Sequence, residues 1–177
     1  MAACVAAFAG GAAAESQPVQ ESRLKAGFLY NFTRFVEWPA DMFQSADAPF
    51  TICIAEEDPF GSLLEEALRQ TKTTGRALVP LRLRANDEPR GCHVLFIGEG
   101  HGWQLDKMKA RIGNGGVLTV GESKDFAARG GVVGMVTAEE RVRLEINLTV
   151  ATRARLTISS RLLSMAHVIY EPAVAKK

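Results

Sequence analysis

Apolar residues recur at helical spacing in one early stretch of the chain and at strand spacing in later stretches. Between Leu24 and Pro39, the side chains of Leu24, Phe28 and Phe35 fall on one side of a helix, with further apolar residues beside them. Ser22 is predicted to cap this helix, and Pro39 to end it, because the residue before a proline is pushed out of the helical region. The pattern predicts a helix with one broad aromatic face.

Short apolar runs after this helix predict buried strands. The runs FTICIA and CHVLFI, at 50–55 and 92–97, are almost continuously apolar, as expected for strands that are covered on both faces. Two further runs, at 78–83 and 117–120, predict two more strands. Helices are predicted between these strands, one starting near Phe60 and one running from about residue 104 to 112.

The later part of the chain predicts a hairpin followed by a helix. Residues 132–137 and 141–147 form the hairpin, because apolar and polar residues alternate in the second run. The closing helix is predicted from about residue 148 to 169, with an interruption near 156–159. Strands that alternate with helices indicate a three-layer α/β domain, with helices on both faces of a mainly parallel sheet and the hairpin as an antiparallel edge.

The first residues have the character of an export signal. Residues 1–14 are small and apolar and end in an A-x-A pattern, which predicts a cleaved signal peptide. No cationic segment precedes the apolar run, which leaves open a true start further upstream. Residues 15–21 are expected to be a mobile lead-in, and residues 22–177 a single domain. The apolar run is shorter than the roughly 20 residues of a membrane span, so the mature protein is expected to be exported and soluble.

Charge and cysteine content narrow the classes of function. The 21 basic and 20 acidic side chains are nearly balanced, which argues against a nucleic-acid partner. After signal cleavage, Cys53 and Cys92 remain; they form a disulfide candidate in an oxidising compartment and would be two buried thiols in a reducing one. Three isolated histidines do not supply the closely spaced ligands of a metal site, so neither a metal nor another cofactor is predicted.

The ends of the predicted strands offer a ligand pocket. Asp58, Gly98 and Glu122 each follow a strand, where parallel α/β sheets commonly bind ligands. The glycine-rich run at 98–102 lacks the third glycine of a dinucleotide motif, so a tight turn explains it better than cofactor binding. An acid–base group of His101, Glu99 and Asp58 would require two loops to converge.

Several stretches resemble one family. The run KAGFLYNFTRFVEWP is similar to the KAAFLYNFAKFVEWP-type signature of the YfiR (HmsC-like) family of periplasmic regulators. Further stretches match in the family's order and spacing; they are DPFG, CHVLFI, LTVGES, GGVVGMV, RVRLEIN and ISSRLL. The resemblance covers nearly all of residues 22–167. Family members also carry one cysteine in the first strand and another opening the third, as this chain does; a second cysteine pair of some relatives, around residues 127–134, is absent.

The resemblance implies a function without catalysis. It implies a periplasmic repressor that binds an inner-membrane diguanylate cyclase through the cyclase's periplasmic domain, and so lowers cyclic-di-GMP signalling and biofilm formation. An outer-membrane lipoprotein and peptidoglycan are implied as further partners, and a homodimer as the assembly. Two alternatives stay open. One is a periplasmic binding module for a small ligand or a peptidoglycan fragment, and the less favoured one is a small nucleotide-dependent enzyme.

The aromatic helix is the first candidate for the partner-binding surface. Tyr30, Arg34 and Trp38 are residue types in which interface binding energy concentrates, and they are predicted to form the binding hot spot. The alternative is that the aromatic side chains of this stretch anchor the helix on the sheet, with Trp38 as a buried lid.

Overall fold

The computed structural model describes residues 16–69, 75–101, 105–113 and 115–171, so the predicted signal peptide at 1–14 lies outside the described residues. The elements up to the fifth strand are α1 (Gln17–Phe35), β1 (Val36–Glu37), η1 (Ala40–Met42), β2 (Phe50–Ala55), α2 (Ser62–Arg69), β3 (Leu78–Leu83), β4 (Val94–Ile97), α3 (Leu105–Ile112) and β5 (Leu118–Gly121). The remaining elements are β6 (Val133–Ala138), β7 (Arg141–Asn147), α4 (Leu148–Arg153), β8 (Thr157–Ile158), α5 (Ser160–Leu163) and β9 (Ala166–Tyr170).

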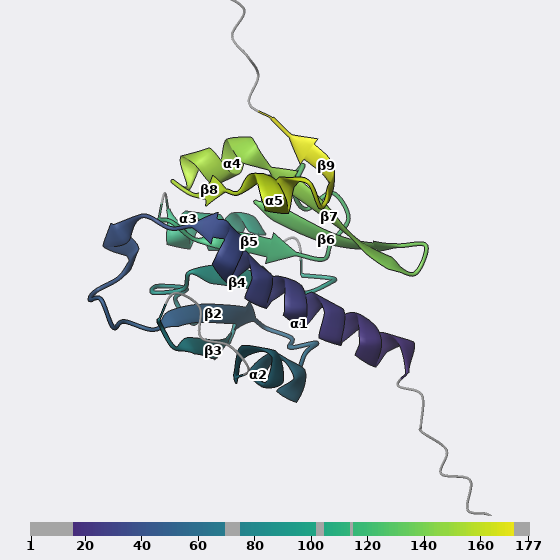
Figure 1. Cartoon of the computed structure of the whole chain (residues 1–177), viewed down its shortest axis with the longest axis horizontal. Helices are drawn as coiled ribbons and strands as arrows, with labels where there is room; N and C mark the ends of the chain where they lie inside the picture. Colours follow the sequence, from purple (N-terminus) through teal and green to yellow (C-terminus); the bar gives the residue numbers. More distant parts are fainter. Residues whose placement is uncertain (1–15, 70–74, 102–104, 114, 172–177) are drawn as a thin grey trace, which may run out of the picture.

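Seven of the described strands form one sheet in the order β3-β2-β4-β5-β6-β7-β9 (Figure 1). The strands from β3 to β6 are parallel, β6 and β7 form the antiparallel hairpin, and β9 runs parallel to β7. The predicted α/β fold with a mainly parallel sheet is confirmed. The hairpin does not form the edge itself, however, because β9 lies outside it.

The central strands are buried on both faces, and alternate side chains enter two separate cores. Ile52 and Ile54 of β2 point to one side, where they pack under α1 and α2. Cys53 and Ala55 point to the other side, where Leu105 and Met108 of α3 cover them. This two-residue alternation explains why the strand sequences are almost wholly apolar, and it confirms that helices cover both faces.

The long helix α1 crosses the front of the sheet in Figure 1 and begins earlier than predicted. Its N-cap is Ser16, whose carbonyl accepts the N–H groups of Val19 and Gln20, so the prediction of Ser22 as the cap is wrong. Pro18 in the first turn suits a helix start, because the first N–H groups have no partner within the helix. Most of the segment predicted as a lead-in is therefore helical.

The same helix ends earlier than Pro39. Residues 36–37 leave the helix to pair in antiparallel register with residues 157–158, and the N–H of Ser159 donates to the carbonyl of Phe35. A strand pairing made across the fold thus ends the helix before the proline does.

The prediction of one interrupted helix at the end of the chain is wrong. The interruption near residues 156–159 is present as β8, but the segments around it are the short helices α4 and α5 and the strand β9. Residues 166–170 alternate between half-buried and exposed, which suits a strand, and they pair with β7. Pairing with a neighbouring strand therefore decides their structure, rather than helical periodicity.

A disulfide joins Cys53 of β2 to Cys92, which lies just before β4. Both residues are fully buried in the core under α3, and their Cα atoms are 5.7 Å apart. The bond closes a loop with a sequence separation of 39, which includes α2 and β3. It therefore constrains the segment that forms the β3 side of the sheet.

Replacing both cysteines with alanine should lower the free energy of unfolding by about 3–4 kcal/mol, because the unfolded chain regains the entropy of the closed loop. Urea unfolding of the variant and of the unreduced parent protein measures the difference. Thiol titration of the unfolded, unreduced parent should find neither Cys53 nor Cys92 reactive. Free thiols at both positions, or equal stability of the two proteins, would contradict the disulfide's role.

Candidate functional site: an acidic cleft at the ends of the parallel strands

A cleft of about 770 Å³ lies where the parallel strands β2, β4 and β5 end. The chain passes from β2 to β3 on one side and then to β4 on the other, so the strand order switches direction between β2 and β4. Open α/β sheets bind ligands at such a switch point, outside the carboxyl ends of the strands. The described lining residues are Gln17, Pro18, Gln20, Glu21, Ser22, Leu24, Lys25, Glu57, Pro59, Gly98, Glu99, Glu122, Thr137, Glu140 and Val142.

A buried lysine organises the wall of the cleft. The ammonium group of Lys25 lies 2.5 Å from a carboxylate oxygen of Glu21, one turn earlier in α1, and 2.5 Å from a carboxylate oxygen of Glu122, just after β5. The other oxygen of Glu122 accepts the N–H of Glu99, and Glu21 accepts the hydroxyl of Thr137 on β6. One network therefore ties α1 to the end of β5, to the loop after β4 and to the hairpin.

This network keeps Lys25 charged. Burial by itself lowers the pKa of Lys25, but the hydrogen bonds to Glu122 and Glu21 outweigh that effect, and the pKa lies above its ordinary value. The pKa of Glu21 is lowered by its hydrogen bonds from Lys25 and Thr137. Both groups stay ionised at neutral pH, so the cleft wall holds fixed charges.

The charge of the cleft favours cationic or neutral ligands. Five glutamates line it, namely Glu21, Glu57, Glu99, Glu122 and Glu140. Lys25 is the only basic residue among the described lining residues, and two of those glutamates already hold it. Phosphate groups would meet like charge here, which counts against the nucleotide-dependent enzyme.

The structure brings together two of the three residues predicted to form a ligand pocket. Gly98 and Glu122 line the cleft. Asp58 serves a structural purpose instead: its carboxylate accepts the N–H groups of Phe60 and Gly61 at the start of α2 and pairs with Arg82 of β3. The lysine and Glu21 were not predicted as site residues, although their spacing of four residues on one helix is that of an ion pair.

The contacts of His101 do not form the acid–base group considered above. Its Nε2 atom faces the exposed carboxylate of Glu57 at 3.7 Å, while Asp58 is held by Arg82 and the start of α2. Among the described residues, no three His, Cys, Asp or Glu side chains are placed to hold a metal ion.

The three residues predicted to bind a partner differ in exposure. Arg34 is exposed on α1, with its guanidinium 5.7 Å from the centre of the Phe35 ring. Tyr30 is half-buried and packs against the core under α1. The contacts of Trp38 make it part of the core packing instead.

Trp38 belongs to a cluster of packed rings at the amino ends of β2 and β4. Its ring packs edge-on against Phe50, and its indole N–H donates to the carbonyl of His93. The His93 ring stacks against Phe43 at 4.5 Å and against Phe50 at 4.7 Å, and the two phenylalanine rings lie 6.3 Å apart. Arg76 covers the outer side of Phe43 at 4.0 Å. These contacts favour the alternative in which Trp38 anchors the chain on the sheet.

The fold and the cleft define a small α/β domain with a mainly parallel sheet and a cleft at its switch point. The chain belongs to the YfiR/HmsC-like family, whose match covers residues 22–167. This confirms the family resemblance of the sequence. No curated protein gives a significant match to the chain. None of the helices in the described residues has both the length and the apolarity that a membrane span needs.

Replacing Lys25 with methionine should lower the free energy of unfolding by about 3–5 kcal/mol at neutral pH, because it leaves the buried carboxylate of Glu122 without its partner. Urea unfolding measures this loss. Arg23→Met is the matched control, since Arg23 lies on the same helix and its ion pair with Glu66 is exposed, worth about 1 kcal/mol or less. Equal losses in the two variants would show that the bridge contributes no more than a surface pair.

Stability should depend on pH through the same network. Because the pKa of Lys25 is raised in the folded state, its ion pairs add to the free energy of unfolding. This stabilisation is complete below the unfolded pKa of about 10.4 and is lost as pH rises through the folded pKa. Because the pKa of Glu21 is lowered in the folded state, its ionised form also stabilises the fold. This stabilisation is complete above the unfolded pKa of about 4.3 and is lost as pH falls through the folded pKa of Glu21. The stability difference between the parent and Lys25→Met should therefore be level from about pH 5 to about pH 10 and shrink on either side. A difference that stays constant beyond those limits would refute this.

Proposed function

We propose that this protein is a periplasmic regulator that represses an inner-membrane diguanylate cyclase by binding its periplasmic domain. Membership of the YfiR/HmsC-like family over residues 22–167 carries the proposal, because members of that family are regulators of this kind. The apolar, A-x-A-ending segment at 1–14 supports export. The disulfide supports an oxidising compartment, where such bonds persist.

Binding without catalysis accounts for the arrangement of the surface. In the cleft wall, Lys25 is paired with Glu21 and Glu122, and the carboxylate of Asp58 is used to start α2, so these groups are positioned as fixed structural charges. A regulator of this kind acts by presenting a preformed surface to the cyclase. Repression then follows from the conformation that the bound protein stabilises in its partner.

A second candidate function is the binding of a small ligand in the acidic cleft. Its support is the volume of about 770 Å³, which lies within the range of small-molecule sites, and its position at the switch point of the sheet. The five glutamates favour a ligand that carries an amine or another cationic group. In a peptidoglycan fragment, the amino groups rather than the carboxylates would face this wall.

The two functions can be separated by expressing the tagged chain in the periplasm and capturing it from detergent-solubilised inner membranes. We expect a diguanylate cyclase to be recovered with it, and cellular cyclic-di-GMP, measured by mass spectrometry, to fall when the chain is expressed. An unrelated exported domain with the same tag is the control. A chain that returns without a cyclase and leaves cyclic-di-GMP unchanged would reject the repressor function. A small cationic molecule released from that same sample on denaturation would support the second candidate.

A further inference from the structure

The outer side of α1 carries an apolar groove. Its volume is about 390 Å³, and its lining residues are Gln20, Arg23, Leu24, Gly27, Phe28 and Asn31, which recur at helical spacing. Leu24 is 49% exposed and Phe28 is half-buried. Gly27 lies between them, and a Cβ atom at this position would meet nothing within 4 Å, so the groove is open where the side chain is missing. The groove offers room for apolar side chains of another molecule.

Two arginines lie beyond the carboxyl end of this groove. Arg34 of α1 and Arg161 of α5 both approach the ring of Phe35, at 5.7 and 5.4 Å from its centre. Within the part of the chain that the structure describes, neither guanidinium forms an ion pair with a carboxylate. Packing against a ring holds a guanidinium in place and leaves its N–H edge open for a carboxylate. The pair is therefore positioned for an acidic group.

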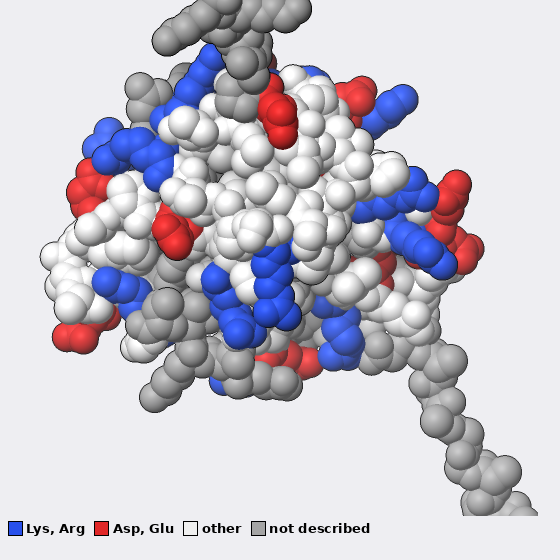
Figure 2. Space-filling model, turned by 45° about the horizontal axis from the view of Figure 1, so that its top comes forward, with Lys and Arg blue, Asp and Glu red and all other residues white. Residues whose placement is uncertain are grey.

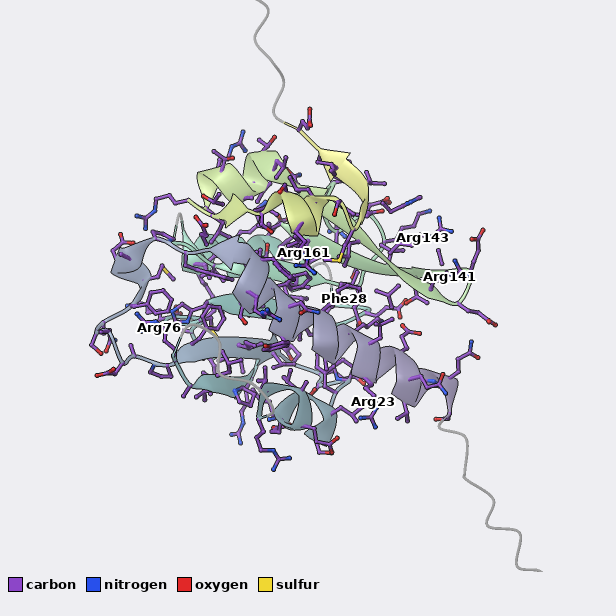
Figure 3. The ribbon with its side chains drawn as sticks, viewed as in Figure 1. Arg23, Phe28, Arg76, Arg141, Arg143 and Arg161 are labelled. Carbon is purple, nitrogen blue, oxygen red and sulfur yellow. A yellow bond between two sulfur atoms is a disulfide. The ribbon has the colours of Figure 1, made fainter. Side chains whose placement is uncertain are left out.

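A third arginine lies at the opposite end of the groove. Arg23 is about 16 Å from Arg34 along the helix axis, given the rise of an α-helix. Its contact with Glu66 of α2 is long, at 3.7 Å, and both side chains are about half exposed. In Figure 3, Arg161, Phe28 and Arg23 follow one another along α1 from its carboxyl half towards α2. Figure 2 shows a wide area without charged side chains on the neighbouring face, with both basic and acidic side chains around its margin.

We propose that this surface, the groove on α1 together with Arg34 and Arg161, binds an acidic amphipathic segment of a partner protein. An apolar side chain of that segment fills the space over Gly27, between Leu24 and Phe28, and a carboxylate is held by Arg34 and Arg161. The inference rests on the proposed function, which requires a protein partner, and it assigns the chemistry of the segment that the partner presents.

A second copy of the chain does not fit this surface. If two copies met about a two-fold axis with antiparallel helices, Arg23 of one would face Arg34 of the other. With parallel helices, each arginine would face its own counterpart. The described residues that line the groove include no acid, so the same surface of a second copy cannot supply the carboxylate. A homodimer would need another surface.

An anionic membrane fits less well than a protein segment. Recognition of anionic lipid by basic residues takes clusters of about 4–8 Lys and Arg, whereas Arg23, Arg34 and Arg161 are the basic residues of this surface, and Arg23 contacts Glu66. The groove is also open at Gly27, where a Cβ atom would meet nothing within 4 Å, which suits the side chains of a protein segment. The charge and shape of this surface thus favour a protein segment.

Selection of a random peptide library displayed on phage, with the full chain as bait, tests the inference without the cyclase. We expect enrichment of peptides that combine apolar residues with Asp or Glu. Their affinity should fall about tenfold or more in the Arg34→Glu, Arg161→Glu double variant, and it should weaken with added salt. The control is the double variant Arg141→Glu, Arg153→Glu, which makes the same change of charge at exposed arginines outside the groove and should bind as the parent does.

Gly27→Leu is a second variant that separates binding from folding. It fills the groove at an open position, and leucine favours a helix over glycine, so the melting temperature should stay equal or rise while peptide affinity falls. Enriched peptides without an acidic bias, no enrichment at all, or equal affinity for the parent and both groove variants would overturn the inference. Binding to phosphatidylglycerol vesicles in place of peptides would also overturn it, in favour of a membrane.

The cyclase capture described above distinguishes this inference from the proposed function. If the parent chain and the Arg34→Glu, Arg161→Glu variant both retain the cyclase, the function stands and the assigned surface is wrong. If the parent captures no cyclase, the function fails, and the peptide selection still decides the chemistry of the surface.

Discussion

A charged group that is buried between a helix and a sheet is tolerated only when its partners are in place. Lys25 is such a group, and its partners fix the position of α1 on the sheet. Its ammonium needs Glu122, which is fixed by the end of β5, and Glu21, which α1 itself supplies. The helix therefore cannot slide or rotate on the sheet without leaving charges unpaired. The position of α1 on the sheet, which Lys25 fixes, therefore determines both the wall of the acidic cleft and the direction of the outer groove.

The central sheet was predictable because its strands are covered on both faces. Runs such as 50–55 and 92–97 must be apolar at every position, and that pattern is visible in the sequence alone. The end of the chain was not predictable in this way. The strand β8 has two residues and the helix α5 has four, so neither spans enough positions to show a period. Their structure depends on pairing with β1 and on packing against α1, which are contacts made across the fold.

In the candidate site, too, some residues could be predicted from the sequence, and others depend on contacts made across the fold. Gly98 and Glu122 could be placed in a pocket because parallel strands end at one edge of a sheet, and strand ends can be located in a sequence. Of the two partners of Lys25, Glu122 could not be identified from the sequence, since it is distant along the chain and only the folded sheet brings it under α1. Tryptophan is a residue type that is common at interfaces, but the contacts of Trp38 with Phe50 and His93 place it in the core packing. Residue type indicated what these side chains could do, and tertiary contacts decided which of them do it.

The cleft and the outer groove share a wall. Gln20 and Leu24 line both of them, because α1 is a single helix with the sheet behind it and open solvent in front. A ligand that moves either side chain changes the free energy of binding in the other site, and the coupling is equal in both directions. A small molecule in the cleft would then alter the affinity for a protein on the groove by the same factor as the protein alters the affinity for the small molecule. In a repressor, that reciprocity is a route by which a periplasmic signal releases the partner.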